Sequence, residues 1–314
     1  MPAPGRRALR GRRGTWPGLF RRWRNDMAAP DAVSDPDGTA GVEVTRMSFD
    51  DFLAVGPRGL YEADRPVVIK LPGSAQGLGR DEVAARLAEL TVTLFTEPGD
   101  KNHPGRWETR DIKLREFFAD EGLLTSADTW HRVVSNIRAN PADVNAVIGF
   151  DAEEFFGYGK SLYAANLWIS HRGVFTKNHF DEFENFNIAL EGRKRFIIAP
   201  PGVRAYYPRS VLRGFGDKSE VVDLDDVDLK RYPRLAAKLA QRRDFVLEPG
   251  HMLYLPLGWW HQAESLDEMN INVNFWLKSK KILHRPHVLG VALYTYAYRR
   301  LKGVYSYRPT EVNS

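Results

Sequence analysis

The pattern of apolar and polar positions changes near residue 155, and the elements it predicts differ on the two sides of that point. Before it, apolar residues recur at helical spacing from Val83 to Leu90 and predict a helix over residues 80–90. A β-branched run over residues 65–71, which ends at a Pro-Gly pair, predicts a strand. The other elements expected here are a short helix after Ser48, a strand over 91–95, and helices over 112–118 and 127–137.

From residue 155 to about residue 280, short apolar stretches follow one another with Gly and Pro between them. This spacing is typical of a β-sandwich or barrel. A long charged segment over residues 202–243 is expected to be an insertion between strands, and the aromatic run 288–301 to be a closing helix, buried on the body or in a homodimer. The strands are expected at residues 163–170, 185–190, 195–199, 244–247, 252–255 and 271–277.

The positive charge of the chain is concentrated at its N-terminus. The net charge is +5, but residues 1–26 carry eight Arg and one Asp, which leaves −2 on the remaining residues. We expect residues 1–42 to be a disordered basic tail, either a solvated leader or a segment that binds an anionic membrane surface or RNA. The domain is expected over residues 43–280, followed by a C-terminal helical extension over 281–314. The mildly acidic body argues against nucleic-acid binding by the folded part.

The absence of cysteine limits the chemistry that this sequence can carry out. Without cysteine there is no disulfide, no thiolate nucleophile and no zinc–thiolate site within these 314 residues. No run of 18 apolar residues occurs, and Arg and Gly interrupt the N-terminus where a secretory signal would have its apolar segment. These features predict a cytoplasmic protein without a transmembrane helix.

Two histidines and one aspartate form the strongest candidate for a metal site. His179 and Asp181 are two residues apart, so on a strand their side chains point to the same face. His261 lies 80 residues beyond Asp181 and must come from another strand or its end. Two histidines and a carboxylate form the facial triad that holds non-haem Fe(II) and leaves positions open for a cosubstrate and oxygen. A His-x-Asp pair alone is more often structural, so the surrounding sequence decides between the two readings.

That surrounding sequence resembles the JmjC domains of Fe(II)- and 2-oxoglutarate-dependent oxygenases. It is most similar to the cupin-like branch that includes the asparaginyl hydroxylase that inhibits the hypoxia-inducible factor. The resemblance covers residues 163–277, roughly a third of the chain. The matching stretches, in the family's order, are HFDE at 179–182, NF at 185–186, GRKR at 192–195, PP at 200–201, PG at 249–250, GWWH at 258–261, ESL at 264–266 and VNFW at 273–276.

The resemblance implies a fold and a set of cofactors. The fold is mainly β with flanking helices, around a double-stranded β-helix core of the jelly-roll, cupin-like type. Fe(II) would be bound by His179, Asp181 and His261. The cosubstrate 2-oxoglutarate would chelate the iron, and oxygen would take the remaining position. The chain is therefore expected to be a dioxygenase that hydroxylates its substrate.

The second carboxylate of 2-oxoglutarate needs a cation or a hydroxyl in the pocket. The family uses a lysine at the position of Lys194, and a threonine at the position of Thr176 contacts the same carboxylate. Asn185 and Asn274 match family positions that line the iron pocket. The alternative for Lys194 and its arginine neighbours is a solvated basic patch. A tyrosine that the family uses upstream has no clear counterpart, although Tyr158 and Tyr163 lie nearby in the sequence.

Three functions remain open at this stage. The leading expectation is hydroxylation of a peptide or protein side chain. The second is hydroxylation of a small molecule or a modified nucleoside, which related cupin-like enzymes include, so the fold alone does not decide. The third is a non-enzymatic cupin that keeps the barrel for metal binding. An intact triad together with Lys194 favours an enzyme.

Overall fold

The protein is described by a computed structural model, which covers residues 43–73, 77–101, 108–126, 128–201, 209–210 and 215–302. The tail predicted over residues 1–42 lies outside these residues. The strands are β1 (Thr45–Met47), β2 (Val67–Lys70), β3 (Thr91–Pro98), β4 (Glu108–Lys113), β5 (Thr129–Asn136), β6 (Leu162–Ser170), β7 (Phe175–Phe180), β8 (Glu184–Glu191), β9 (Lys194–Ala199), β10 (Arg209–Ser210), β11 (Phe215–Ser219), β12 (Arg243–Leu247), β13 (His251–Leu255), β14 (Trp260–Ser265) and β15 (Asn270–Leu277).

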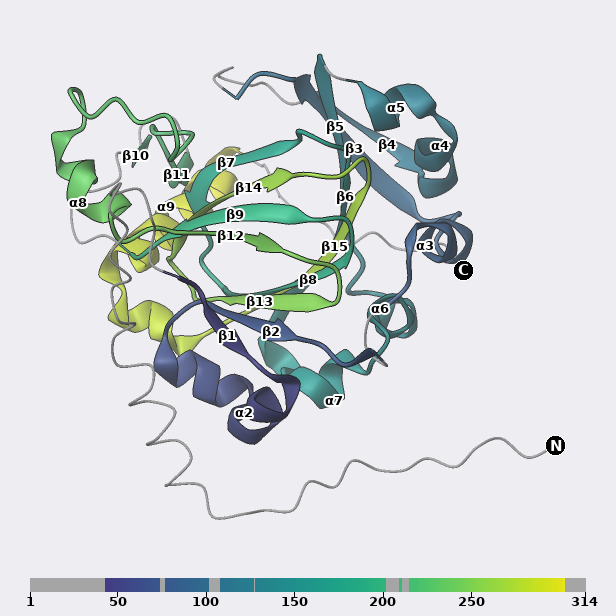
Figure 1. Ribbon diagram of the computed structural model, residues 1–314, viewed down its shortest axis with the longest axis horizontal. Helices are drawn as coiled ribbons and strands as arrows, with labels where there is room; N and C mark the ends of the chain where they lie inside the picture. Colours follow the sequence, from purple (N-terminus) through teal and green to yellow (C-terminus); the bar gives the residue numbers. More distant parts are fainter. Residues whose placement is uncertain are drawn as a thin grey trace. The chain divides into compact units, whose positions relative to one another are not determined.

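The helices lie around the strands and in the long connections (Figure 1). The α-helices are α2 (Phe49–Ala63), α3 (Arg80–Arg86), α4 (Leu114–Ala119), α5 (Glu121–Thr125), α6 (Pro141–Ile148), α7 (Ala152–Phe156), α8 (Ala236–Leu239) and α9 (Pro286–Lys302). Short 3₁₀ turns are η2 (Gly159–Ser161), η4 (Pro233–Leu235) and η5 (Lys280–His284). No helix among the described residues is both long enough and apolar enough to cross a membrane.

Two facing sheets form the centre of the fold (Figure 1). The larger has the strand order β1-β2-β13-β8-β15-β6-β5-β3-β4, and the smaller has the order β10-β11-β7-β14-β9-β12. From β6 to β9 and from β12 to β15, successive strands alternate between the sheets, which is the winding of a jelly roll. The expected mainly-β architecture with a jelly-roll core is confirmed.

One predicted element is wrong in type. Residues 127–137 were expected to form a helix, but β5 occupies residues 129–136. This segment pairs with β3 on one side and with β6 on the other, so it lies inside the larger sheet. Thr129, Trp130 and the two adjacent valines suit a strand, and pairing on both edges outweighs the weak helical preference of the sequence. The error matters for the site, because β5 lines the barrel.

The outer face of the larger sheet is covered by aromatic packing against α2 and α7. The Phe156 ring from α7 lies 4.8 Å from Phe186 and 4.9 Å from Phe275, measured between ring centroids. Helix α2 begins where it was expected, because the Ser48 hydroxyl accepts a hydrogen bond from the Asp51 backbone N–H. It continues to Ala63, well beyond the short helix that was predicted. These helices leave the inner face of the sheet for the barrel interior.

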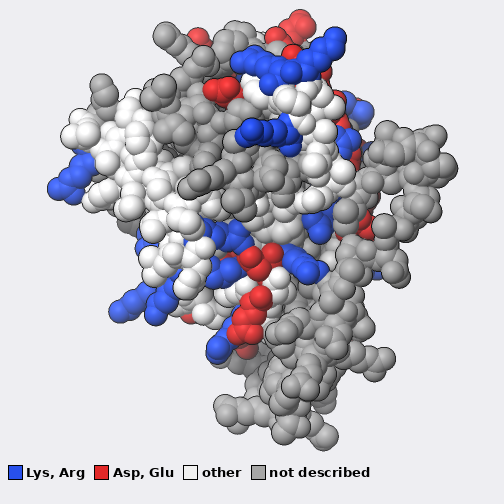
Figure 2. Space-filling view, turned by 90° about the vertical axis from the view of Figure 1, so that its left-hand side faces the viewer, with Lys and Arg blue, Asp and Glu red and all other residues white. Residues whose placement is uncertain are grey.

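Charged side chains are mixed over the face shown in Figure 2. Lys and Arg lie there beside Asp and Glu, with uncharged surface between them, and the described residues form no continuous basic area in this view. Positive and negative side chains outside the N-terminal segment are therefore mixed on this face, in line with the small net charge of residues 27–314.

A buried ionic cluster joins the C-terminal segment to the barrel. The Glu184 carboxylate is 0% exposed, accepts a hydrogen bond from the Tyr254 hydroxyl at 2.8 Å, and lies 3.4 Å from the Lys281 ammonium. Lys281 and Arg285 both also pair with Asp64 at the end of α2. Burial, and then the carboxylate of Glu184, raises the pKa of Tyr254 well above its usual value, which keeps this hydroxyl a donor.

Replacing Lys281 with methionine is expected to lower the free energy of unfolding by roughly 3 kcal/mol, because Glu184 would stay buried without its cation. Urea unfolding followed by circular dichroism measures the change. Lys280→Met is the matched control, since Lys280 is an exposed neighbour and its loss should have little effect. Equal stability of the two variants would show that the cluster contributes nothing to folding.

Candidate metal and cosubstrate site

The three predicted metal ligands converge at one end of the barrel. His179 lies near the end of β7, Asp181 follows that strand, and His261 is the second residue of β14. Their ligand atoms all lie within 4.8 Å of one another. The Nε2 atoms of the two histidines lie 3.8 Å from different oxygens of Asp181, which is too far for a hydrogen bond. The arrangement joins residues 80 positions apart through the pairing of β14 with β7, where His261 faces His179.

Backbone carbonyls fix the orientation of both imidazoles. The Nδ1 atom of His179 lies 2.8 Å from the Lys177 carbonyl, and that of His261 lies 3.1 Å from the Trp259 carbonyl. A carbonyl only accepts, so each Nδ1 carries the proton and each Nε2 presents its lone pair towards Asp181. Burial, and then the neighbouring His179, lowers the pKa of His261 to about 4, so this ring is neutral near pH 7. Two imidazoles and one carboxylate fit a first-row divalent metal.

The turn before His261 is tied to the segment that carries Asp181. The Gly258 N–H donates to the Asp181 carbonyl at 2.8 Å, and the Leu257 N–H donates to the Glu184 carboxylate at 3.2 Å. Gly258 has φ +81°, and a Cβ there would lie 2.8 Å from the Val288 side chain. Glycine is therefore required by both conformation and space. These bonds set the distance between the two ligand-bearing segments.

A chain of side-chain hydrogen bonds ends on the Asp181 carboxylate. The Trp168 indole donates to Asn274 at 2.8 Å, Asn274 donates to Asn185 at 3.2 Å, and Asn185 donates to Asp181 at 2.8 Å. Asn185 and Asn274 were expected to line the pocket, and the structure links both to the Asp181 carboxylate through these hydrogen bonds. Their amides hold the carboxylate in one orientation, as outer partners of a metal ligand commonly do.

Thr176 joins His179 on the inner face because of a bulge in β7. His179 faces His261 and Thr176 faces Ala263, so Lys177 and Asn178 together oppose a single residue of β14. Strict alternation would turn Thr176 away from the metal ligands. Asn178 points outward instead, where its amide donates to the Val221 carbonyl of the insertion.

Lys194 is buried inside the barrel and not in a solvated patch. Only 7% of the residue is exposed, whereas Arg193 and Arg195 lie at the surface and pair with Asp267 and Asp244. Burial, and then the nearby guanidinium of Arg132, lowers the pKa of Lys194 to about 8. An anionic ligand beside Lys194 would stabilise the charged form of this side chain.

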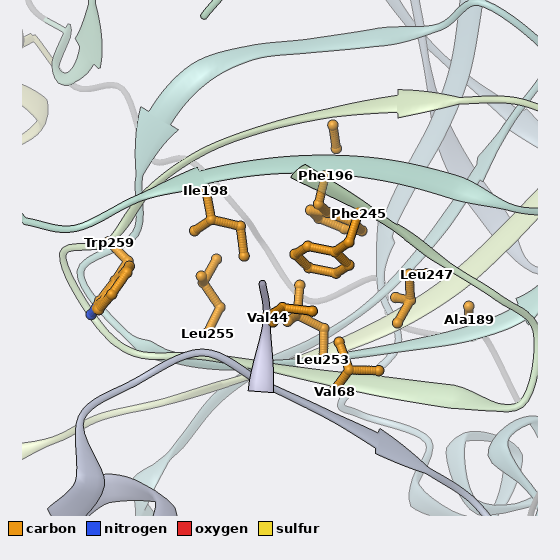
Figure 3. Packing of buried hydrophobic residues seen from close by; sticks show 11 residues of the cluster. Val44, Val68, Ala189, Phe196, Ile198, Phe245, Leu247, Leu253, Leu255 and Trp259 are labelled. Atoms are coloured by element: carbon orange, nitrogen blue, oxygen red, sulfur yellow. The ribbon is translucent and has the colours of Figure 1, made fainter. Parts of the chain in front are cut away.

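The barrel interior has an apolar side and a polar side. Figure 3 shows the apolar side, where Phe196 and Ile198 of β9 meet Leu253 and Leu255 of β13. On the polar side, four neighbouring strands carry asparagine at matching positions. These residues are Asn136, Asn166, Asn274 and Asn187.

Asn166 in that row is fully buried, and neither its Nδ2 nor its Oδ1 meets a hydrogen-bond partner among the described residues. A buried amide in this condition is costly unless water or a ligand pairs with it. Its position opposite Asn274 therefore supports a polar ligand beside the metal ligands.

Sequence reasoning missed Arg132 and Asn166 as pocket residues. Arg132 was hidden by the wrong assignment of β5 as a helix, although alternation along 130–136 would have placed it with Asn136 on one face. The candidate tyrosines do not fill the gap. Tyr158 packs against Phe275 on the outer face of the larger sheet, and Tyr163 stacks on Phe183 at a centroid distance of 4.4 Å.

Comparison with known proteins defines the family. The model of the cupin-like domain matches residues 9–281, and the chain belongs to this family. The prediction of a cupin-like, JmjC-type domain is therefore confirmed at the level of the family.

Curated relatives match parts of the chain. The lysine-specific demethylase JMJ31 of Arabidopsis thaliana is 31% identical over 128 residues, 40% of this chain and 23% of that protein. HSPB1-associated protein 1 of Homo sapiens is 32% identical over 126 residues, 39% of this chain and 25% of that protein. The tRNA wybutosine-synthesizing protein 5 of Gallus gallus is 31% identical over 177 residues, 53% of this chain and 50% of that protein. The matches thus span half or less of these relatives.

Proposed function

We propose that the protein is an Fe(II)- and 2-oxoglutarate-dependent dioxygenase that hydroxylates its substrate. The observation that carries the proposal is the convergence of His179, Asp181 and His261 in a barrel that also buries Lys194. A structural metal site needs no buried lysine, and a solvated lysine needs no metal cluster. Their combination matches a cosubstrate with one chelating end and one anionic end.

Each residue then has a defined task. When bound, iron would activate oxygen, the oxidant, for attack on a C–H bond of the substrate, and conversion of 2-oxoglutarate to succinate and carbon dioxide would supply the two further electrons. His179, Asp181 and His261 would hold the metal, and the carbonyls of Lys177 and Trp259 would keep both rings in the required tautomer. Asn185 would fix the carboxylate of Asp181, and Lys194 would bind the distal carboxylate of the cosubstrate as a point charge.

For the substrate, the leading candidate is a peptide or protein side chain. Two observations support this candidate. One is the sequence resemblance to the asparaginyl hydroxylase, and the other is the match to a lysine-specific demethylase. Both of these proteins act on side chains of proteins.

A modified nucleoside is the second candidate, and two observations favour it. The match to tRNA wybutosine-synthesizing protein 5 covers more of this chain than the two other relatives named above. In addition, Phe183, two residues after Asp181, is stacked between Tyr163 and Trp276, with centroid distances of 4.4 and 5.6 Å. Aromatic side chains are the usual partners of unstacked bases.

Fe(II) and 2-oxoglutarate added to the anaerobic protein are expected to produce a visible metal-to-ligand charge-transfer band. Air should then yield succinate, and a peptide or a nucleoside substrate should increase the yield. Succinate is measured by chromatography, and His179→Ala serves as the blank. Metal binding without the band and without succinate would identify a non-enzymatic cupin and refute the proposal.

A further inference from the structure

One turn joins the two segments that carry the metal ligands. In this turn, between β13 and β14, the Gly258 N–H donates to the Asp181 carbonyl at 2.8 Å. The next carbonyl, that of Trp259, lies 3.1 Å from the Nδ1 atom of His261. The turn thus contacts the backbone of one ligand and the ring of another. A shift of the turn would move Asp181 and His261 relative to each other and would change their fit to a metal.

A buried carboxylate fixes the position of this turn. The Oε2 atom of Glu184 accepts from the Leu257 N–H at 3.2 Å and from the Tyr254 hydroxyl at 2.8 Å. Its Oε1 atom lies 3.4 Å from the Lys281 ammonium. Successive residues of a strand point to opposite faces, and Asn185 points to Asp181, so Glu184 lies on the outer face of β8. Glu184 therefore reaches the metal ligands through the turn.

The C-terminal segment contacts the same carboxylate and the same turn. Lys281, in η5, pairs with Glu184 and also with Asp64 at the end of α2. From the first turn of α9, the Val288 side chain lies against Gly258, where a Cβ would be 2.8 Å from it. The segment that runs from η5 into α9 is therefore packed on the piece of chain that spaces the metal ligands.

We propose that Glu184 is a positioning residue through which the segment from η5 into α9 sets the spacing of Asp181 and His261. This inference rests on the proposed function, because it requires that the triad binds a metal. A purely stabilising role would be met as well by apolar side chains of similar volume, since these often replace a buried ion pair without loss of stability. They would not accept the Leu257 N–H, and the turn would lose its fixed place.

The experiment separates positioning from stability with two double variants of equal charge. Glu184→Gln/Lys281→Met keeps an oxygen that accepts from the Leu257 N–H, whereas Glu184→Met/Lys281→Met does not. Dissociation constants for Mn(II), used in place of Fe(II), are measured by calorimetry. The methionine pair should bind Mn(II) about 10- to 100-fold more weakly than the glutamine pair. The electron paramagnetic resonance spectrum of bound Mn(II) should also differ between them, because it reports the ligand geometry.

Phe156→Leu is the control for a general loss of stability. The ring of Phe156 packs on the outer face of the same sheet, so its loss should lower the free energy of unfolding in urea. Mn(II) affinity, measured where the protein is fully folded, should not change. If the methionine pair binds Mn(II) as tightly as the glutamine pair, or if Phe156→Leu weakens binding equally, Glu184 only stabilises the fold and the proposal is overturned.

Glu184→Asp covers the case in which the methionine pair does not fold. It keeps the charge that pairs with Lys281 but withdraws the carboxylate from the Leu257 N–H by one methylene. Mn(II) binding should therefore be weaker than in the unmodified protein, and equal affinity would overturn the proposal.

Hydrogen exchange in the unmodified protein gives an independent measurement. Coupling between two sites is reciprocal, so bound Mn(II) should slow amide exchange in η5 and in the first turns of α9. Helix α4, which packs against β4 at the edge of the larger sheet, is the control and should not respond. Unchanged exchange at η5 would contradict the coupling.

The outcomes distinguish this inference from the function on which it rests. Metal binding without conversion of 2-oxoglutarate would refute the proposed function and leave the role of Glu184 intact. Metal binding that is equal in all the Glu184 variants would overturn that role and leave the proposed function intact. A protein that binds no metal would refute both.

Discussion

Replacing Asp181 with alanine is expected to weaken Fe(II) binding by more than about 100-fold and to abolish succinate formation. Changing an outer partner of a metal ligand already costs about 10- to 100-fold in affinity, and Asp181 is the anionic ligand itself. The side chain also lies between the two imidazoles, 3.8 Å from each Nε2. Equilibrium dialysis against Fe(II) or Mn(II) measures the change.

The fold should survive this substitution, because the Asp181 backbone carbonyl that accepts from Gly258 is retained. Glu264→Gln is the matched control. Glu264 lies on β14 like His261, but it points outward and pairs with Lys101. Wild-type metal affinity in Asp181→Ala, with normal circular dichroism, would rule out the triad.

Replacing Lys194 with methionine is expected to weaken 2-oxoglutarate binding by roughly 100-fold while Fe(II) affinity changes less than about threefold. The methionine removes the charge but keeps most of the volume in a buried position. The affinity of the unmodified protein should also depend on pH. Lys194 has a pKa of about 8, so it is charged below pH 8 and loses its charge above it. Binding of the anion should therefore weaken as the pH rises through 8.

Both effects are measured by titrating the anaerobic Fe(II) protein with 2-oxoglutarate between pH 6.5 and 9 or so. In the Lys194→Met variant, the affinity for 2-oxoglutarate should no longer show the fall above pH 8 that deprotonation of Lys194 causes. Arg193→Met is the control, because Arg193 is exposed and pairs with Asp267 at the surface. A variant that keeps both the affinity and its pH dependence would mean that another residue holds the distal carboxylate.

Much of the site could be predicted because its chemistry is local in sequence. His179 and Asp181 are neighbours, and His261 follows a recognisable turn. Lys194 begins β9 directly after the hairpin from β8. Each of these residues lies in a segment whose pattern matches a known family, so no knowledge of the remote contacts was needed.

The rest of the pocket depends on contacts between distant strands. Residues 129–136 form a strand because β3 and β6 pair with them, and these partners lie about 35 residues away on either side. Asn166 is unremarkable in sequence, and only its place opposite Asn274 makes its unpaired amide informative. Propensity alone does not carry such information, because tertiary pairing decides between helix and strand where propensities are close.

The bulge in β7 has a consequence for how the chain tolerates changes in length. Thr176 and His179 are three positions apart, and in a regular strand residues at an odd separation point to opposite faces. Both side chains point inward here only because Lys177 and Asn178 share one partner on β14. Loss or gain of a single residue here would turn one of the two outward. The described part of the segment between β9 and β12 carries none of the three metal ligands, so a change of length there would not turn a ligand outward. We therefore expect related chains to differ in length there, and to keep the three-position spacing wherever the pocket is retained.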